Sequence, residues 1–163
     1  MNLKISTLNK NNIDVIWPLF YEVISKTDTF IYEANISKED AQEMLFHKNS
    51  DVYAAYNQKN EVAGWYRLRP NQLGKGSHIA NASFMVALKH QHQGIGKQLG
   101  EHAIKTAKEK GYKAMQFNMV VCNNNPSIKL WLKLGFRILA RLPKAYQHSS
   151  QGYIDSFLMH KEL

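Results

Sequence analysis

The chain has 163 residues, a length at which a single domain can bury a full hydrophobic core. Its 44% apolar and 21% charged residues are typical of a globular protein in water, and no apolar stretch approaches the length of a membrane span. The formal net charge is +8, but the lysines and arginines are scattered, which argues against nucleic-acid binding and suits a ligand with several phosphates. We therefore expect one domain over residues 1–163 and no membrane partner.

Cysteine and histidine usage excludes further classes. A single cysteine, Cys122, rules out an internal disulfide and fits a reducing compartment. The first twelve residues lack the apolar core of a signal peptide, so we expect a cytoplasmic protein. His90 and His92 have no cysteine or carboxylate at ligand spacing, so no metal site is expected.

The first part of the chain predicts a strand, two helices and a hairpin. Asn2–Thr7 is predicted as a short strand. Residues 12–25 carry apolar side chains at helical spacing, although Pro18 predicts a kink or a late start. Ser37 is expected to cap a second helix. Two strands joined by a turn follow, at Val52–Tyr56 and Glu61–Arg69.

The central stretch joins an apolar segment to a glycine-rich turn and a helix. Ile79–Leu88 is short and apolar, as in a buried strand. The turn is Gln91–Lys97 (QHQGIGK), and from Ile95 apolar residues recur every four positions until Gly111. A helix N-terminus leaves backbone N–H groups unpaired, and glycines before it let an anion reach them. The sequence therefore predicts a phosphate-binding loop.

The last part of the chain predicts three strands and one helix. Tyr112–Val121 is a further apolar strand. Asn125 is expected to cap a helix, with Pro126 at its first position and Gly135 closing it. The final strands are expected at Phe136–Arg141 and Tyr153–Lys161. The resulting order, β-α-α-β-β-β-α-β-α-β-β, predicts a mixed sheet with helices on both faces.

Two motifs carry a resemblance to a known superfamily. The spacing Gln-x-x-Gly-x-Gly in Gln91–Gly96 fits neither a dinucleotide-binding fingerprint nor a P-loop. It resembles the pyrophosphate loop of the GCN5-related N-acetyltransferase (GNAT) superfamily. Asn124–Phe136, NNPSIKLWLKLGF, resembles the second signature of that superfamily, in the right order and at about the right distance. The order of the predicted elements is also that of the superfamily.

The resemblance implies a fold and a cosubstrate. The fold is a single-domain α/β GNAT fold, a mixed, mostly antiparallel sheet with splayed parallel central strands and helices on both faces. The cosubstrate is acetyl-CoA, whose pantetheine arm would lie along Phe84, Met85 and Val86. Its pyrophosphate would lie on Gln91, His92, Gln93, Gly94, Ile95, Gly96 and Lys97. Asn124, Ser127 and Trp131 of the second signature are also expected to contact the cosubstrate, and superfamily habit implies a possible homodimer.

The sequence departs from the superfamily at the catalytic positions. Members often place a glutamate on the central strand as base and a tyrosine in the second signature as acid. Here Trp131 has the tyrosine position, and no carboxylate lies between His78 and Leu88. His78, at the entrance of the strand, is a candidate base, and Glu33 and Asp155 could supply the missing carboxylate only if the fold brings them in.

Three asparagines replace the missing groups in a second resemblance. Asn81, Asn118 and Asn124 resemble three asparagines of the yeast proline-analogue (azetidine-2-carboxylate) N-acetyltransferases, which link them to substrate placement and catalysis. By that resemblance Asn81 and Asn124 are catalytic, and Asn81 and Asn118 bind substrate. An asparagine can place a carboxylate, an amine or a water without titrating. Tyr32 is a further candidate for the substrate pocket.

We therefore expect an acetyl-CoA-dependent N-acetyltransferase that modifies a small-molecule amine, an amino acid or imino-acid analogue, by direct attack in a ternary complex. Two alternatives stay open. The acceptor could instead be a peptide, a protein or a polyamine. The chain could also be a CoA-binding module without catalysis, which the tryptophan at position 131 favours.

Overall fold

The computed structural model describes residues 3–163, and its helices and strands follow in the predicted order. The strands are β1 (Lys4–Leu8), β2 (Asp51–Tyr56), β3 (Val62–Pro70), β4 (Ile79–Val86), β5 (Ala114–Val121), β6 (Arg137–His148) and β7 (Gly152–Glu162). The α-helices are α1 (Ile13–Lys26), α2 (Lys38–Leu45), α3 (Ile95–Glu109) and α4 (Asn125–Lys133). Asn2 of the predicted first strand lies outside the described residues.

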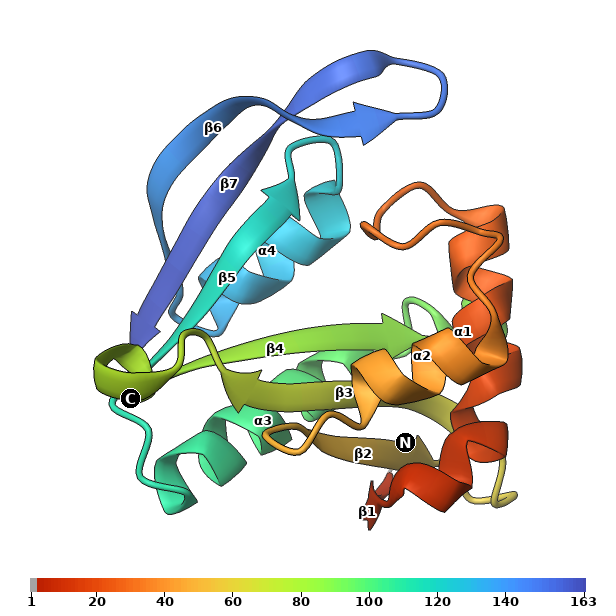
Figure 1. Cartoon of the computed structure of the whole chain (residues 1–163). Helices are drawn as coiled ribbons and strands as arrows, with labels where there is room; N and C mark the ends of the chain where they lie inside the picture. Colours follow the sequence, from red (N-terminus) through yellow and green to blue (C-terminus); the bar gives the residue numbers. More distant parts are fainter. Residues whose placement is uncertain (1–2) are drawn as a thin grey trace.

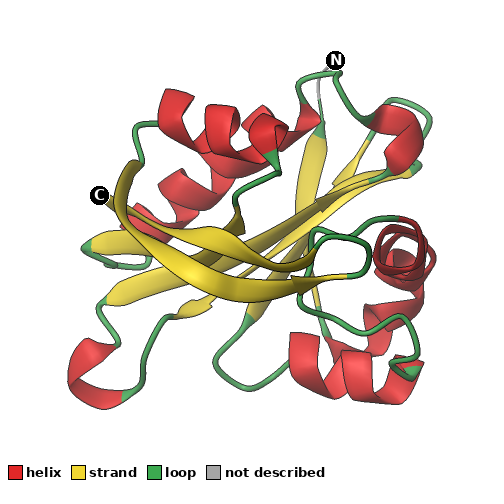
Figure 2. Ribbon diagram, turned by 90° about the horizontal axis from the view of Figure 1, so that it is seen from above, coloured by secondary structure: helices red, strands yellow, loops and turns green. Residues whose placement is uncertain are grey.

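The strands form one sheet in the order β1-β2-β3-β4-β5-β7-β6, and every pair is antiparallel except β4 with β5. Helices α1 and α2 cover one face and α3 and α4 the other (Figures 1 and 2). The predicted fold is confirmed. Among the described residues, no helix is long and apolar enough to cross a bilayer.

Each face of the sheet has its own apolar core, because successive strand residues point to opposite faces. On the α1/α2 face, Phe20 packs with Trp65 and Met85, and all three are buried. On the α3/α4 face, Leu99 and Trp131 belong to a separate buried cluster. Met85 is buried on the α1/α2 face. Because side chains alternate along a strand, those of Ser83 and Asn81 in β4 point to the same face.

Three details of the sequence prediction were wrong. Helix α1 begins at Ile13 and contains Pro18, so the late start, one of the two effects expected of this proline, is wrong: the buried residues on both sides of Pro18, such as Ile16 and Phe20, hold the segment against the sheet. Asn124, and not Asn125, caps α4: its side-chain oxygen accepts from Ser127 N at 3.2 Å. Strand β6 continues to His148, across an irregularity in its pairing with β7.

The central parallel pair opens along its length. Strands β4 and β5 pair only at Ile79 with Ala114 and at Ala80 with Met115, the first residues of each strand. Beyond these pairs the strands diverge (Figure 1), so that the far half of β4 pairs with β3 alone. We call the space between the diverging strands the β4–β5 gap. The predicted splay of the central strands is confirmed.

Candidate active site

The loop from β4 to α3 leaves the start of the helix uncapped. His92 and Gly94 both have left-handed backbones, with φ of 61° and 79°. Gly94 is the N-cap residue and offers no side chain, and the helical ladder begins where Gln98 N donates to Gly94 O at 3.2 Å. The preceding N–H groups of the first turn are therefore left for a ligand. Such groups, together with the helix dipole, can bind an anion.

The edge of β4 presents backbone groups to the β4–β5 gap. The hydrogen bonds from Ala87 N to Ala63 O and from Asn71 N to Ile79 O show that the odd-numbered residues of β4 pair with β3. The backbone N–H and C=O groups of the even-numbered residues Ala82, Phe84 and Val86 consequently face the gap. The predicted pantetheine edge is thus corrected at one residue, because the Met85 backbone is directed to β3.

Asn81 lies where the gap begins. The residue is 7% exposed, and its side-chain Nδ2 donates to Gln116 O at 2.9 Å. Gln116 is the first β5 residue beyond the last backbone pair, so the Asn81 amide satisfies a carbonyl that β4 backbone no longer reaches. Among the described residues, nothing donates to Asn81 Oδ1. Asn81 therefore links the two strands and keeps one acceptor free.

Gln116 also connects Asn81 to Asn118. The Gln116 side chain donates to Asn118 Oδ1 at 2.9 Å, and Asn118 in turn donates to Asn71 Oδ1 at 2.8 Å. Asn118 is exposed, whereas Asn81 is buried. The structure thus brings two of the three predicted asparagines into one chain of amide hydrogen bonds along the same side of β5.

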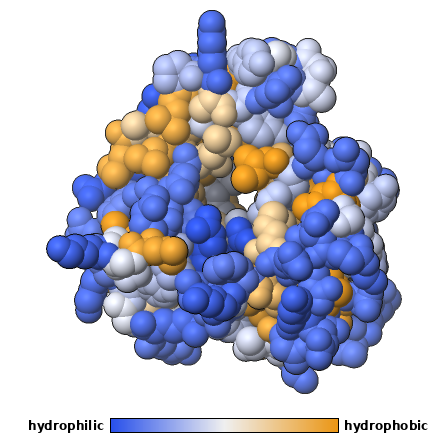
Figure 3. Space-filling view, in the orientation of Figure 1, coloured by the Kyte–Doolittle hydropathy of each residue, from blue (hydrophilic) through white to orange (hydrophobic). Residues whose placement is uncertain are grey.

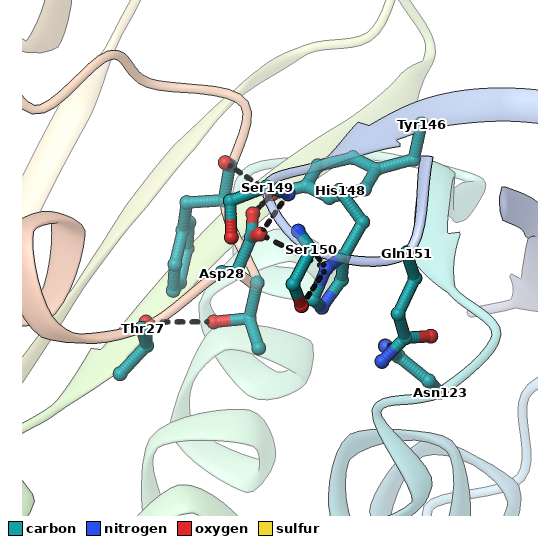
Figure 4. A network of polar contacts seen from close by, with 10 residues as sticks. Thr27, Asp28, Asn123, Tyr146, His148, Ser149, Ser150 and Gln151 are labelled. Atoms are coloured by element: carbon teal, nitrogen blue, oxygen red, sulfur yellow. Dashed lines mark hydrogen bonds and ion pairs between the residues drawn. The ribbon is translucent and has the colours of Figure 1, made fainter. Parts of the chain in front are cut away.

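A polar cluster joins the α1–α2 loop to the β6–β7 hairpin (Figure 4). Asp28 Oδ1 accepts from the Tyr146 hydroxyl at 2.7 Å, and Oδ2 accepts from Ser149 N and lies 3.2 Å from His148 Nδ1. The Tyr146 hydroxyl is also 2.9 Å from Phe30 O. We call Asp28, Tyr146, His148 and Ser149 the Asp28 latch. It ties two segments that flank the central hollow visible in Figure 3.

The latch shifts two pKa values. Burial raises the pKa of Asp28, but hydrogen bonds from Ser149 and Tyr146 outweigh burial and lower it to about 2. Burial raises the pKa of Tyr146, and the hydrogen bond to Asp28 and its charge raise it further. The latch therefore holds an ionised carboxylate beside a neutral phenol.

The sequence of the chain matches the Acetyltransferase (GNAT) family over residues 16–136. The chain belongs to the GNAT family. The match spans the segment from α1 to the start of β6, which includes the glycine-rich loop, the β4–β5 gap and α4.

Individual proteins agree with this assignment. N-acetyltransferase aca1 of Schizosaccharomyces pombe is 32% identical over 106 residues, which are 64% of this chain and 51% of that protein, so the match spans about half the length of that relative. A GCN5-related N-acetyltransferase from Kribbella flavida is 33% identical, with a TM-score of 0.91 over 99% of this chain and 98% of the other. The putative acetyltransferase yncA from Salmonella typhimurium, solved with its cofactor acetyl-CoA, is 20% identical and shares the fold, with a TM-score of 0.82 over 100% and 95% of the two chains.

The second GNAT signature has a structural role at two positions. Asn124 Oδ1 caps α4 through Ser127 N, which orders the first turn of that helix. Trp131 is 6% exposed, and its ring centroid lies 4.7 Å from that of Phe84 and 4.6 Å from that of Phe117. The indole therefore supports the residues on both sides of the β4–β5 gap. Packed in this way, it belongs to the core of the GNAT fold.

The other candidates lie at different distances from the gap. His78 is exposed at the closed end, before the paired residues, and its Nδ1 is 3.1 Å from Lys75 O. Asp155 is engaged by Arg141 and by Lys144 N on the hairpin. Glu33 is exposed in the α1–α2 loop. Tyr32, in the same loop, is half-buried and packs 5.4 Å from Phe20, on the face to which Asn81 points.

Sequence reasoning missed two groups of residues. The Asp28 latch joins positions more than a hundred residues apart, and no local pattern marks them. Arg67 is a buried cation in β3, 8% exposed, on the same face as Asn81. An arginine between Tyr66 and Leu68, within the largely apolar segment that was predicted as a strand, was a signal for Arg67.

We expect the Asp28 latch to stabilise the fold except in acid. Because folding lowers the pKa of Asp28 from 3.8 to about 2, its contribution is present above pH 3.8 and is lost as the pH falls toward 2. Urea unfolding should show Asp28→Ala to be less stable than wild type by about 1–2 kcal/mol at neutral pH. The two curves should converge in acid.

The matched control is Asp14→Ala, which removes a carboxylate that is 75% exposed and pairs with Lys38. It should change the unfolding free energy by less than about 1 kcal/mol. A difference between wild type and Asp28→Ala that persists undiminished into acid would contradict the role given to the carboxylate.

Proposed function

We propose that the protein transfers the acetyl group of acetyl-CoA to the amine of a small amino acid or imino acid. The β4–β5 gap carries this proposal, because its free backbone edge leads directly to the uncapped N-terminus of α3. The acetyl-CoA bound to the Salmonella yncA protein, which has the same fold, supports the same ligand here.

In this proposal the gap-facing edge binds the pantetheine arm as an added strand would be bound. The backbone groups of Phe84 and Val86 pair with the pantetheine amides, and the first-turn N–H groups of α3 hold the pyrophosphate. A gap-facing N–H is then available to polarise the thioester carbonyl, as in an oxyanion hole. The net charge of +8 favours the anionic cosubstrate at long range.

The proposed reaction is direct attack by a neutral amine on the thioester carbon. The new C–N bond forms, the C–S bond breaks, and the amine loses a proton while the thiolate gains one. In this proposal Asn81 Oδ1, which has no donor within the described residues, holds the amine or a water that accepts the proton. Trp131 cannot supply the proton that the thiolate gains, because its indole N–H is not an acid at ordinary pH. In this proposal water protonates the thiolate.

The Asp28 latch favours a small acceptor over a peptide. A peptide acceptor needs an open groove, whereas the latch fastens the α1–α2 loop to the β6–β7 hairpin at this end of the molecule (Figure 4). A binding site for a polyamine should be lined with carboxylates, and residues 81–86 of β4 include no aspartate or glutamate.

The test is a panel assay that follows thiol release from acetyl-CoA. The acceptors are the common amino acids, azetidine-2-carboxylate, spermidine and short peptides. We expect turnover of amino or imino acids and none of peptides or spermidine. Turnover of peptides or spermidine alone would overturn the acceptor class. Tight acetyl-CoA binding without any turnover would overturn the transferase itself in favour of a binding module.

A further inference from the structure

Arg67 is a buried cation without an anionic partner. It lies in the middle of β3, and 8% of its surface is exposed. None of the ion pairs among residues 3–163 includes it. A buried charge is costly unless it is paired, so an unpaired guanidinium at this depth calls for an explanation.

Its hydrogen bonds are also incomplete. Nη1 donates to Met44 O at 2.7 Å, near the C-terminal end of α2, whereas Nε is buried with no acceptor. The indole N–H of Trp65, the preceding residue on this face of β3, is likewise buried and unpaired. A role confined to capping α2 would use Nη1 and leave Nε without an acceptor. Two buried donors on this face, Arg67 Nε and Trp65 Nε1, therefore have no acceptor within the described residues.

Arg67 lies beside the proposed acceptor site. It is opposite Ser83 in β4, the strand that borders the β4–β5 gap, and on the same face as Asn81. Burial lowers the pKa of Arg67, an effect that nearby Tyr32 opposes and the Arg69 charge reinforces. Tyr32 belongs to the α1–α2 loop that the Asp28 latch holds.

From this geometry we infer that Arg67 binds the carboxylate of the acceptor. A planar guanidinium matches a carboxylate, and a bound carboxylate would give the buried cation the anionic partner that it lacks. In an α-amino or imino acid the amine is two bonds from the carboxylate. Strand β4, which presents Asn81 and the gap, is one of the two strands beside Arg67, so a carboxylate at Arg67 leaves the amine within reach of that strand. This inference rests on the proposed acetyl transfer and adds its requirement: an acceptor that carries a carboxylate beside its amine.

The experiment compares acceptors that differ only at the carboxylate. The specificity constant is measured for proline and azetidine-2-carboxylate and for their carboxamides, with wild type, Arg67→Gln and Arg67→Lys. Wild type should prefer the acids to the amides, and Arg67→Gln should lose about 30-fold on the acids, mostly in KM, and little on the amides. Arg67→Lys keeps the charge but lacks the planar pair of N–H donors, so its specificity constant on the acids should lie between those of wild type and Arg67→Gln. Affinity for acetyl-CoA, measured by calorimetry, should be unchanged in both variants, which also shows that they fold.

Arg137→Gln is the control for net charge, since it removes an arginine that is 71% exposed and pairs with Glu162. It should keep the wild-type preference for acids. Equal turnover of acids and amides by wild type, or a preference that survives in both folded Arg67 variants, would overturn this inference and leave acetyl transfer standing. Absence of turnover on every acceptor would instead overturn the proposed function, and the inference with it.

Discussion

Gly94→Val should weaken acetyl-CoA binding by about 10²–10³-fold, because two effects add. A left-handed backbone costs a residue with a side chain about 1–2 kcal/mol, so the variant loop relaxes and binding must restore it. A side chain at Gly94 would meet no protein atom within 4 Å, so it would lie in open space at the N-cap, and we expect it to hold a phosphate away from the uncapped N–H groups. Losing a hydrogen bond from one of these groups to a phosphate costs about 1.5–3 kcal/mol more.

Calorimetry with acetyl-CoA and with S-acetylpantetheine, which lacks the pyrophosphate, separates the phosphate contact from the rest of the site. The loss should be large for acetyl-CoA and small for S-acetylpantetheine. Gly111→Val is the matched control, because Gly111 follows the other end of α3 with φ of 85° and open space around it. Gly111→Val should lose about as much stability as Gly94→Val but keep the wild-type affinity for acetyl-CoA. Equal affinity losses in the two variants would remove the phosphate role of the loop.

The glycine-rich loop could be predicted because its signal is local. An apolar strand, two glycines and a helical repeat follow one another within residues 79–111, and each fixes its own conformation from neighbouring residues. The order of the elements was predictable for the same reason. Pro18 shows the limit of local rules, since packing of the apolar side of α1 against the sheet keeps the helix continuous.

Strand register limited the prediction of the gap. Alternation predicts that neighbouring residues of β4 differ in direction, but only pairing with β3 shows which of them turn their backbone toward β5. For this reason Met85 was predicted to bind the pantetheine arm together with Phe84 and Val86, although its backbone N–H and C=O are directed to β3. The same register puts Arg67 and Asn81 on one face, a proximity that their positions in the sequence do not reveal.

Long-range contacts were beyond sequence reasoning altogether. The Asp28 latch depends on the path of the α1–α2 loop and on the length of β6, which extends beyond the predicted strand. Asp28 and Ser149 lie in loops, where an aspartate and a serine are ordinary turn residues until the fold brings them together with Tyr146 and His148.

Asn81→Ala should lower the specificity constant for an amino-acid acceptor by about 10²-fold, since a displacement of about 1 Å at a reacting centre has this effect. The Asn81 amide takes the first β5 carbonyl beyond the last backbone pair, and its side chain bridges the distance between the strands at that point. Without it, Gln116 O loses its donor, at a cost of about 1–3 kcal/mol in unfolding free energy unless the carbonyl reaches water. The opening of the gap would no longer be fixed, and Oδ1 would no longer be present to hold the amine or a water.

Asn118→Ala is the matched control, because Asn118 belongs to the same chain of amides but is exposed and does not bridge β4 and β5. It should cost less than about 10-fold in the specificity constant, an energy of about 1.4 kcal/mol. Asn81→Asp separates the two roles of Asn81. The carboxylate keeps an acceptor for the amine but cannot donate to Gln116 O, so activity should stay low if the bridge between the strands matters. Full activity in Asn81→Asp would assign catalysis to the acceptor oxygen alone. Full activity in Asn81→Ala would show that the backbone pairs at Ile79 and Ala80 suffice to set the gap.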